Sequence, residues 1–266
     1  MYVFACNPKE KTHKLDLSVA NSTALDYYNL GWQQIMDYGQ YGAAEASYRK
    51  AIGIDPNFLI GKSVLARLTL DLGERLSLYK ELQIGKEVLT GDERLLIEVY
   101  SAFVKLTNVR EQTPEKAKDI LNKALGVAKK NLGIIVRKYP DEVYLKSEYI
   151  EILHALYGAR PALDSLEKLR TPDQKRNPFL LGYQASMEAE LGLFDLALLR
   201  ADLLESIISD ASVPKSYAVY ADIYLKMDSL EKAKQYVDKG FALDKRNLDI
   251  SRLKTKIDTK LQSTAH

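Results

Sequence analysis

The sequence predicts an all-α fold in which about six helical hairpins stack into a right-handed superhelix capped by a C-terminal helix. Short glycine-centred turns recur at a constant period: Gly39 to Gly73 and Gly158 to Gly192 are each 34 residues apart. Between these turns the apolar residues return every three or four positions, which is the period of an amphipathic helix. No segment combines apolar–polar alternation with β-branched residues, so we expect no strands.

The composition narrows the class of protein and of site. With 266 residues, 46% of them hydrophobic, the chain can bury a sizeable core. Its 38 basic and 36 acidic residues give a net charge of +2, which lacks the excess of positive charge that is typical of nucleic-acid-binding proteins. A single cysteine excludes an intrachain disulfide framework and a cysteine-rich zinc site. We therefore expect no nucleic-acid partner, no metal and no cofactor.

The first 21 residues are predicted to be a flexible segment, because the stretch from Asn7 to Lys14 is polar. Val3-Phe4-Ala5-Cys6 resembles the end of a bacterial lipoprotein signal, although only five residues precede the cysteine. Two interpretations stay open. If translation starts upstream of Met1, Cys6 is a lipidation site and anchors the protein in the cell envelope. If Met1 is the true start, Cys6 is an ordinary thiol and the protein is cytoplasmic.

Residues 22–247 form the predicted repeat domain, with the hairpins following one another along the chain. The period places a turn at Asn108, and the excess length after it is assigned to a longer unit, 108–158. The loop Lys138–Pro140 lies in this unit and is expected to carry partner specificity, since insertions in repeat arrays often map to a binding face. A last turn is predicted at Asp228.

Prolines mark several predicted helix starts. Thr113 is predicted to be a helix cap and Pro114 the first helical residue after it. Pro178 and Pro214 are predicted to open helices in the same way. Residues 248–262 form the predicted capping helix, because one apolar stripe on it would cover the last hairpin while its other faces are charged.

Small and aromatic residues recur in a packing pattern. The first hairpin carries it as Tyr28, Leu30, Gly31, Tyr41, Ala44, Tyr48, Ala51 and Pro56, and residues 214–247 repeat it as Tyr217, Tyr220, Ala221, Tyr224, Ala233 and Gly240. This pattern resembles the tetratricopeptide repeat. The resemblance implies that helices approach closely over the small residues while aromatic rings fill the space between hairpins. One extra residue separates Gly31 from Gly39, and we expect it to bulge the first helix.

No constellation of residues indicates catalysis. Gly61-Lys62-Ser63 matches the end of a phosphate-binding loop, but the required first glycine is replaced by Pro56 and no strand precedes it. His154 lies among apolar residues of a predicted helix and is expected to be packed rather than to act as a base or ligand. We therefore predict that the protein is not an enzyme.

The resemblance implies a non-catalytic scaffold that holds a peptide or helix of a partner protein on the concave surface of the array. The residues expected to face this groove are Asn29, Arg67, Glu98, Tyr149, Tyr183 and Asp222. A cationic clamp for a partner's carboxylates is not expected, because Ser63 and Val64 stand where cations would be needed. Two alternatives stay open: an envelope-anchored lipoprotein with a structural or assembly role, and a helical-repeat enzyme with dispersed site residues.

Overall fold

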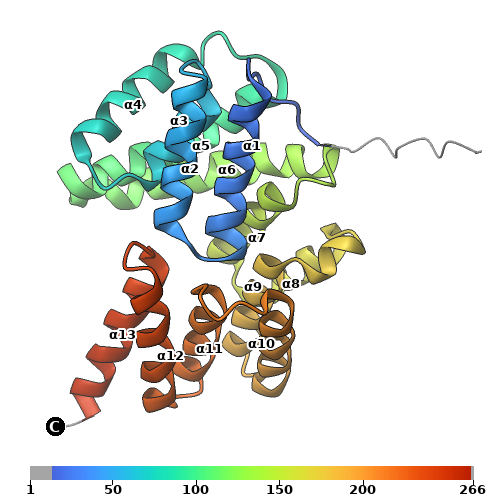
Figure 1. Ribbon diagram of the computed structural model, residues 1–266, viewed down its shortest axis with the longest axis vertical. Helices are drawn as coiled ribbons and strands as arrows, with labels where there is room; N and C mark the ends of the chain where they lie inside the picture. The colour runs from blue at the N-terminus through green and yellow to red at the C-terminus, as the bar shows by residue number, and fades with distance from the viewer. Residues whose placement is uncertain (1–13, 265–266) are drawn as a thin grey trace, which may run out of the picture.

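The computed structural model describes residues 14–264, and within them it contains thirteen α-helices and no strand. The helices form six consecutive hairpins and one final helix, which confirms the predicted all-α repeat architecture (Figure 1). The hairpins are α1 (Ser22–Trp32) with α2 (Tyr41–Ile54), α3 (Leu59–Leu68) with α4 (Leu72–Gly85), α5 (Gly91–Gln112) with α6 (Ala117–Lys138), α7 (Val143–Tyr157) with α8 (Ala159–Leu169), α9 (Pro178–Glu190) with α10 (Phe194–Ile208), and α11 (Lys215–Lys226) with α12 (Leu230–Leu243), followed by α13 (Leu248–Thr264).

The first hairpin packs as its small and aromatic residues predict. A Cβ atom added to Gly31 of α1 would lie 2.4 Å from the ring of Tyr48 on α2, so only glycine fits there. Ala44 and Ala51 are fully buried in the same contact, and the Tyr48 ring is almost completely buried. In this hairpin the helices therefore approach over small residues, and a large ring fills the space between them.

The extra residue of the first hairpin produces a π-helical turn. After Trp32 the chain continues as η1 (Gln33–Asp37), a five-residue π-helix that ends just before Gly39. This confirms the expected bulge in the first helix. Gly39 has a φ of +70°, which glycine adopts without the steric cost that a Cβ atom would add.

The turn predicted at Asn108 is wrong. Asn108 lies inside α5, where it is buried and its Oδ1 accepts a hydrogen bond of 2.7 Å from Nε of Arg75. The chain turns instead at Thr113, and Pro114 opens a short 3-10 turn, η2 (Pro114–Lys116), ahead of α6. The excess length of the middle repeat is thus taken up by two helices of 22 residues each.

Residues 14–20 are held against the array where a flexible segment was expected. Their backbone N–H groups donate to carboxylates at the ends of three hairpins: Leu15 to Glu142 (2.8 Å), Ser18 to Glu93 (3.0 Å) and Ala20 to Asp55 (2.7 Å). Cys6, the residue considered for lipidation, lies outside the described residues. Among residues 14–264 no helix has the length and apolar character needed to cross a membrane.

The two ends of the repeat array meet. In Figure 1 the lower end of α2 lies next to the turn between α12 and α13. A backbone hydrogen bond also joins the first hairpin to the last one, since the N–H of Lys215 at the start of α11 donates to the carbonyl of Tyr38 (3.1 Å). The array therefore closes on itself around its central face.

Candidate functional site

A three-residue segment that begins with the last residue of the π-helical turn connects the first hairpin to the starts of several later helices. Asp37 is buried and accepts hydrogen bonds from the Tyr144 hydroxyl (2.7 Å), the Asn177 side chain (3.0 Å) and the Phe179 N–H (3.3 Å). Asn177 caps α9, so the Asp37 carboxylate lies at the N-terminus of that helix, where the helix dipole favours negative charge. We call Asp37, Tyr38 and Gly39 the closure hub.

The hub also reaches the last helix of the chain. The carbonyl of Gly39 accepts a hydrogen bond of 2.7 Å from Nδ2 of Asn247, and the Oδ1 of Asn247 accepts the N–H of Ile250 in the first turn of α13. Together with the contact between Tyr38 and Lys215, the hub therefore contacts the starts of α9, α11 and α13.

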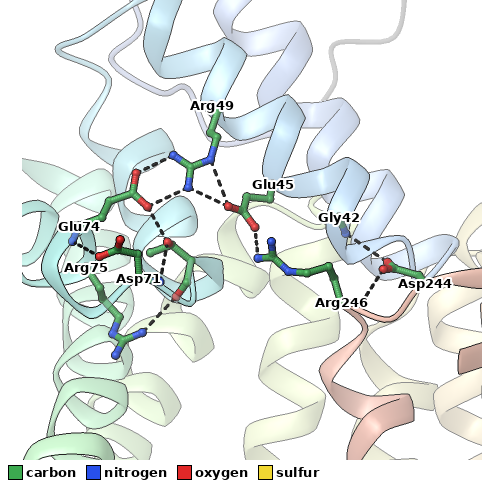
Figure 2. A network of polar contacts seen from close by, with 9 residues as sticks. Gly42, Glu45, Arg49, Asp71, Glu74, Arg75, Asp244 and Arg246 are labelled. Atoms are coloured by element: carbon green, nitrogen blue, oxygen red, sulfur yellow. Dashed lines mark hydrogen bonds and ion pairs between the residues drawn. The ribbon is translucent and has the colours of Figure 1, made fainter.

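A second group of polar contacts fastens α2 to the turn before α13 (Figure 2). Glu45 is buried and pairs with Arg246 and, at 2.8 Å, with Arg49. Arg49 also pairs with Glu74 of α4 at 2.6 Å, so one guanidinium group links two carboxylates from neighbouring hairpins. The N–H of Gly42 donates to Asp244, 3.1 Å away. The interaction is a network rather than a single exposed ion pair, which would contribute little.

Closure leaves a pocket of about 350 Å³ between the first and last hairpins. The pocket is lined by residues of seven helices and the loops beside them, among them Trp32, Tyr41, Tyr48, Arg67, Glu148, Glu151, Phe179, Lys215, Asp249 and Arg252. Trp32, the only tryptophan of the chain, stacks on Tyr144 with 6.0 Å between ring centroids and 13° between planes. Aromatic rings and charged groups thus share one concave surface, as is usual for ligand sites.

One charge pair in the pocket is internally satisfied. Arg67 lies 2.6 Å from a carboxylate oxygen of Glu148, and its guanidinium group stands 4.8 Å from the centre of the Tyr100 ring. The Tyr100 hydroxyl donates to the other oxygen of Glu148 at 3.0 Å. These contacts hold Arg67 and Glu148 in place, so the pair forms a fixed floor of the pocket.

Two other charged groups of the pocket have no such partner. Glu151 of α7 and the Nζ of Lys215 make no hydrogen bond or ion pair with any residue of the described chain, 14–264. Desolvation, with the carboxylates of Asp249 and Glu148 nearby, raises the pKa of Glu151 to about 8. Burial lowers the pKa of Lys215, whose ammonium group lies 4.2 Å from the centre of the Phe179 ring.

Of the residues expected to line a groove, Arg67 lies in this pocket and Tyr183 lies beside it. Tyr183 stacks on the pocket residue Phe179, and its hydroxyl hydrogen-bonds to Nδ1 of His154 at 2.7 Å. Tyr149 is placed differently: it is 5% exposed and packs in the core, with Gly133 against its ring. Its expected role on an accessible groove wall is therefore wrong, because the helix face that carries it is buried against α6.

The other three expected residues are spread over separate surfaces. Asn29 is exposed and borders a different cavity, which Lys14, Leu15 and Leu17 help to line. Glu98 links Arg94 and Asn131, each at 3.1 Å, between α5 and α6. Asp222 forms an ion pair of 2.6 Å with Lys226 one turn away. The six residues do not form one continuous surface.

Comparison with known families agrees with the packing of the first and last hairpins. The family model for the tetratricopeptide repeat matches residues 27–58 and residues 214–247. The chain contains tetratricopeptide repeats. No curated protein matches it significantly. The two matched units are the hairpins α1–α2 and α11–α12, which are the two that meet at the closure. Tetratricopeptide repeats generally mediate protein–protein interaction, and proteins built from them are typically non-catalytic scaffolds.

Several pocket residues of this chain with tetratricopeptide repeats were missed from the sequence. Glu151 and Lys215 look like ordinary solvated charges, since Lys and Glu are common on exposed helix faces. Asp249 and Arg252 belong to the predicted capping helix, whose charged face reads as solvent-exposed. The one local signal was the extra residue before Gly39, because insertions in repeat arrays often map to a binding face. Within residues 14–264 no group of three or more potential ligands could hold a metal ion.

Proposed function

We propose that the protein is a non-catalytic interaction scaffold that holds a short segment of its partner in the pocket between its first and last hairpins. The observation that carries this proposal is the composition of the pocket wall. Trp32, Tyr41 and Phe179 offer apolar surface, while Glu151 and Lys215 offer an acid and a base that no side chain among residues 14–264 hydrogen-bonds or pairs with. Aromatic anchors beside a few charged groups are typical of interaction hot spots.

The size of the pocket limits what the partner contributes. A volume of about 350 Å³ is at the lower end of the range for small-molecule sites and suits one or two residues rather than a long extended peptide. The ion pair between Glu45 and Arg246 also joins the two ends of the array, so the site differs from an open groove that runs the length of the array. The proposal is thus narrower than the peptide-holding groove that the family resemblance implies.

Site-specific photocrosslinking in extract of the native organism tests the proposal. A benzophenone amino acid replaces Arg252, an exposed residue at the pocket rim, and in a matched protein it replaces Leu199, which is 64% exposed on α10 and does not line the pocket. We expect a partner to crosslink from position 252 and not from position 199. Equal crosslinking from both positions, or crosslinking from 199 alone, contradicts the proposal.

A further inference from the structure

Glu151 and Lys215, an acid and a base, line one pocket and do not pair with each other. Glu151 comes from the inner face of α7, one turn beyond Glu148, and Lys215 is the first residue of α11. Their charged atoms are more than 4 Å apart, since no ion pair within that distance joins them. Each group is partly buried, and the surface that it keeps lines the pocket.

Ionising both groups in this partly desolvated site costs stability, because each charge loses water without gaining a hydrogen bond or an ion pair from residues 14–264. Neighbouring groups do not remove the cost. Asp249 accepts the Tyr41 hydroxyl and lies 3.6 Å from Arg252, while Arg67 is held by Glu148. Among the charged side chains of the pocket, those with neither a hydrogen bond nor an ion pair to residues 14–264 are thus one acid and one base, more than 4 Å apart.

We propose that this pocket recognises an ammonium group and a carboxylate group presented together, with Glu151 binding the ammonium and Lys215 the carboxylate. This inference rests on the proposed function, because it names the chemistry that the same pocket accepts. Phe179, Trp32 and Tyr41 would surround the carbon atoms that join the two groups. Two sources supply this chemistry: a free amino acid, and a partner chain that ends in lysine.

The unique tryptophan gives a direct readout, because Trp32 lines the pocket and is the only tryptophan in the chain. The purified full-length protein is titrated with each of the twenty common free L-amino acids, and with the peptide Gly-Gly-Gly-Gly-Lys, while Trp32 emission and calorimetric heat are recorded. The best ligand is then tested in two capped forms, one with its carboxylate amidated and one with its amine acetylated. Each cap removes one of the two charges.

We expect saturable binding of at least one probe, weakened tenfold or more by either cap. Binding should also weaken tenfold or more in Glu151→Gln and in Lys215→Met. The matched control is Lys50→Met, because Lys50 also lies over an aromatic ring, 5.3 Å from the centre of Tyr27, but outside the pocket. Circular dichroism verifies that each variant keeps its helix content.

The binding results distinguish the two sources of the ligand, and they distinguish failure of this inference from failure of the scaffold function. Binding of a free amino acid but not of the lysine-ending peptide assigns the site to a metabolite, and the reverse result assigns it to a partner's C-terminus. If no probe binds, or if capped and uncapped forms bind equally, the inference is wrong. A partner that still crosslinks from position 252 in that case leaves the scaffold function standing, with a different ligand chemistry.

Discussion

Asp37 accepts a hydrogen bond from the side chain of Asn177, 140 positions later in the chain. Asn177 in turn caps α9 by accepting the N–H of Leu180. A residue at the end of the π-helical turn of the first hairpin is thereby fixed to the first turn of the fifth hairpin. In a plain repeat array each unit contacts only its neighbours, so this contact makes distant hairpins depend on each other.

Replacing Asp37 should therefore weaken the whole molecule. In Asp37→Ala the donors from Tyr144, Asn177 and Phe179 lose their common acceptor in a buried site. Unsatisfied buried donors typically cost 1–3 kcal/mol each, with part recovered by relaxation, so we expect a loss of about 2–3 kcal/mol in the free energy of unfolding. Urea denaturation measures it. Asp26→Ala, at an exposed position of α1, should change it by less than about 0.5 kcal/mol, and equal losses in both would contradict the role of Asp37.

Two glycines of the array should respond oppositely to the same substitution. In Gly31→Ala the new Cβ would meet the Tyr48 ring at 2.4 Å, so overpacking should cost about 1–3 kcal/mol. In Gly126→Ala nothing lies within 4 Å, and the alanine should stabilise α6 by roughly 0.5–1 kcal/mol. Thermal or urea denaturation of the pair decides the matter. A stabilised Gly31→Ala protein would show that the two helices are not as close as described.

Two of the three tyrosines of α7 separate a core position from a surface position. Tyr149 is 5% exposed and Tyr157 is 49% exposed on the same helix. We expect Tyr149→Ala to lower the free energy of unfolding by about 3 kcal/mol or more, as for other large-to-small aromatic substitutions in cores. Tyr157→Ala should lower it by less than about 1 kcal/mol. Similar losses of unfolding free energy in both variants would mean that Tyr149 lies on the accessible surface.

Stability should fall with rising pH because of Glu151. Its pKa is about 8 in the folded protein and 4.5 in the unfolded chain, owing to desolvation beside Asp249 and Glu148, which outweigh the opposing charges of Lys215 and Arg67. Between these pH values the folded state keeps a proton that the unfolded state has lost. The free energy of unfolding therefore decreases as the pH rises from 4.5 to 8.

The contribution of Glu151 is isolated by comparison with Glu151→Gln. As the pH rises from 4.5 to 8, the free energy of unfolding of the wild type should decrease relative to that of this variant. Below and above that window the difference between the two proteins should stay constant. Glu167→Gln, at an exposed site on α8, serves as the control and should show no such trend. A pH-independent difference for Glu151→Gln would mean that its carboxylate is well solvated.

Much of the fold could be predicted because local sequence patterns indicate a repeat architecture. Helix period, glycine turns and prolines gave the six hairpins and the final helix, and the spacing from Gly31 to Gly39 gave the π-helical turn. The turn at Asn108 failed because the period was extended through a repeat whose helices are longer. There, a buried hydrogen bond with Arg75 holds an asparagine inside a helix.

The pocket could not be predicted, because it depends on which distant segments meet. Lys215 reads locally as a helix start after Pro214, and Glu151 reads as one charge among many on α7. Only closure brings them to one cavity, and closure depends on single contacts such as that between Asp37 and Asn177. Such contacts leave no periodic trace in the sequence.

The distance between α2 and α13 in solution tests closure most directly. Spin labels are attached at Ala46→Cys and Lys256→Cys, both exposed, after Cys6, the only native cysteine, is replaced by serine. Double electron–electron resonance should give one narrow distance population, which broadens when Asp37→Ala removes the hub contacts. A broad population of long distances in the protein with Asp37 intact would show an open array, and the pocket would then not exist as described.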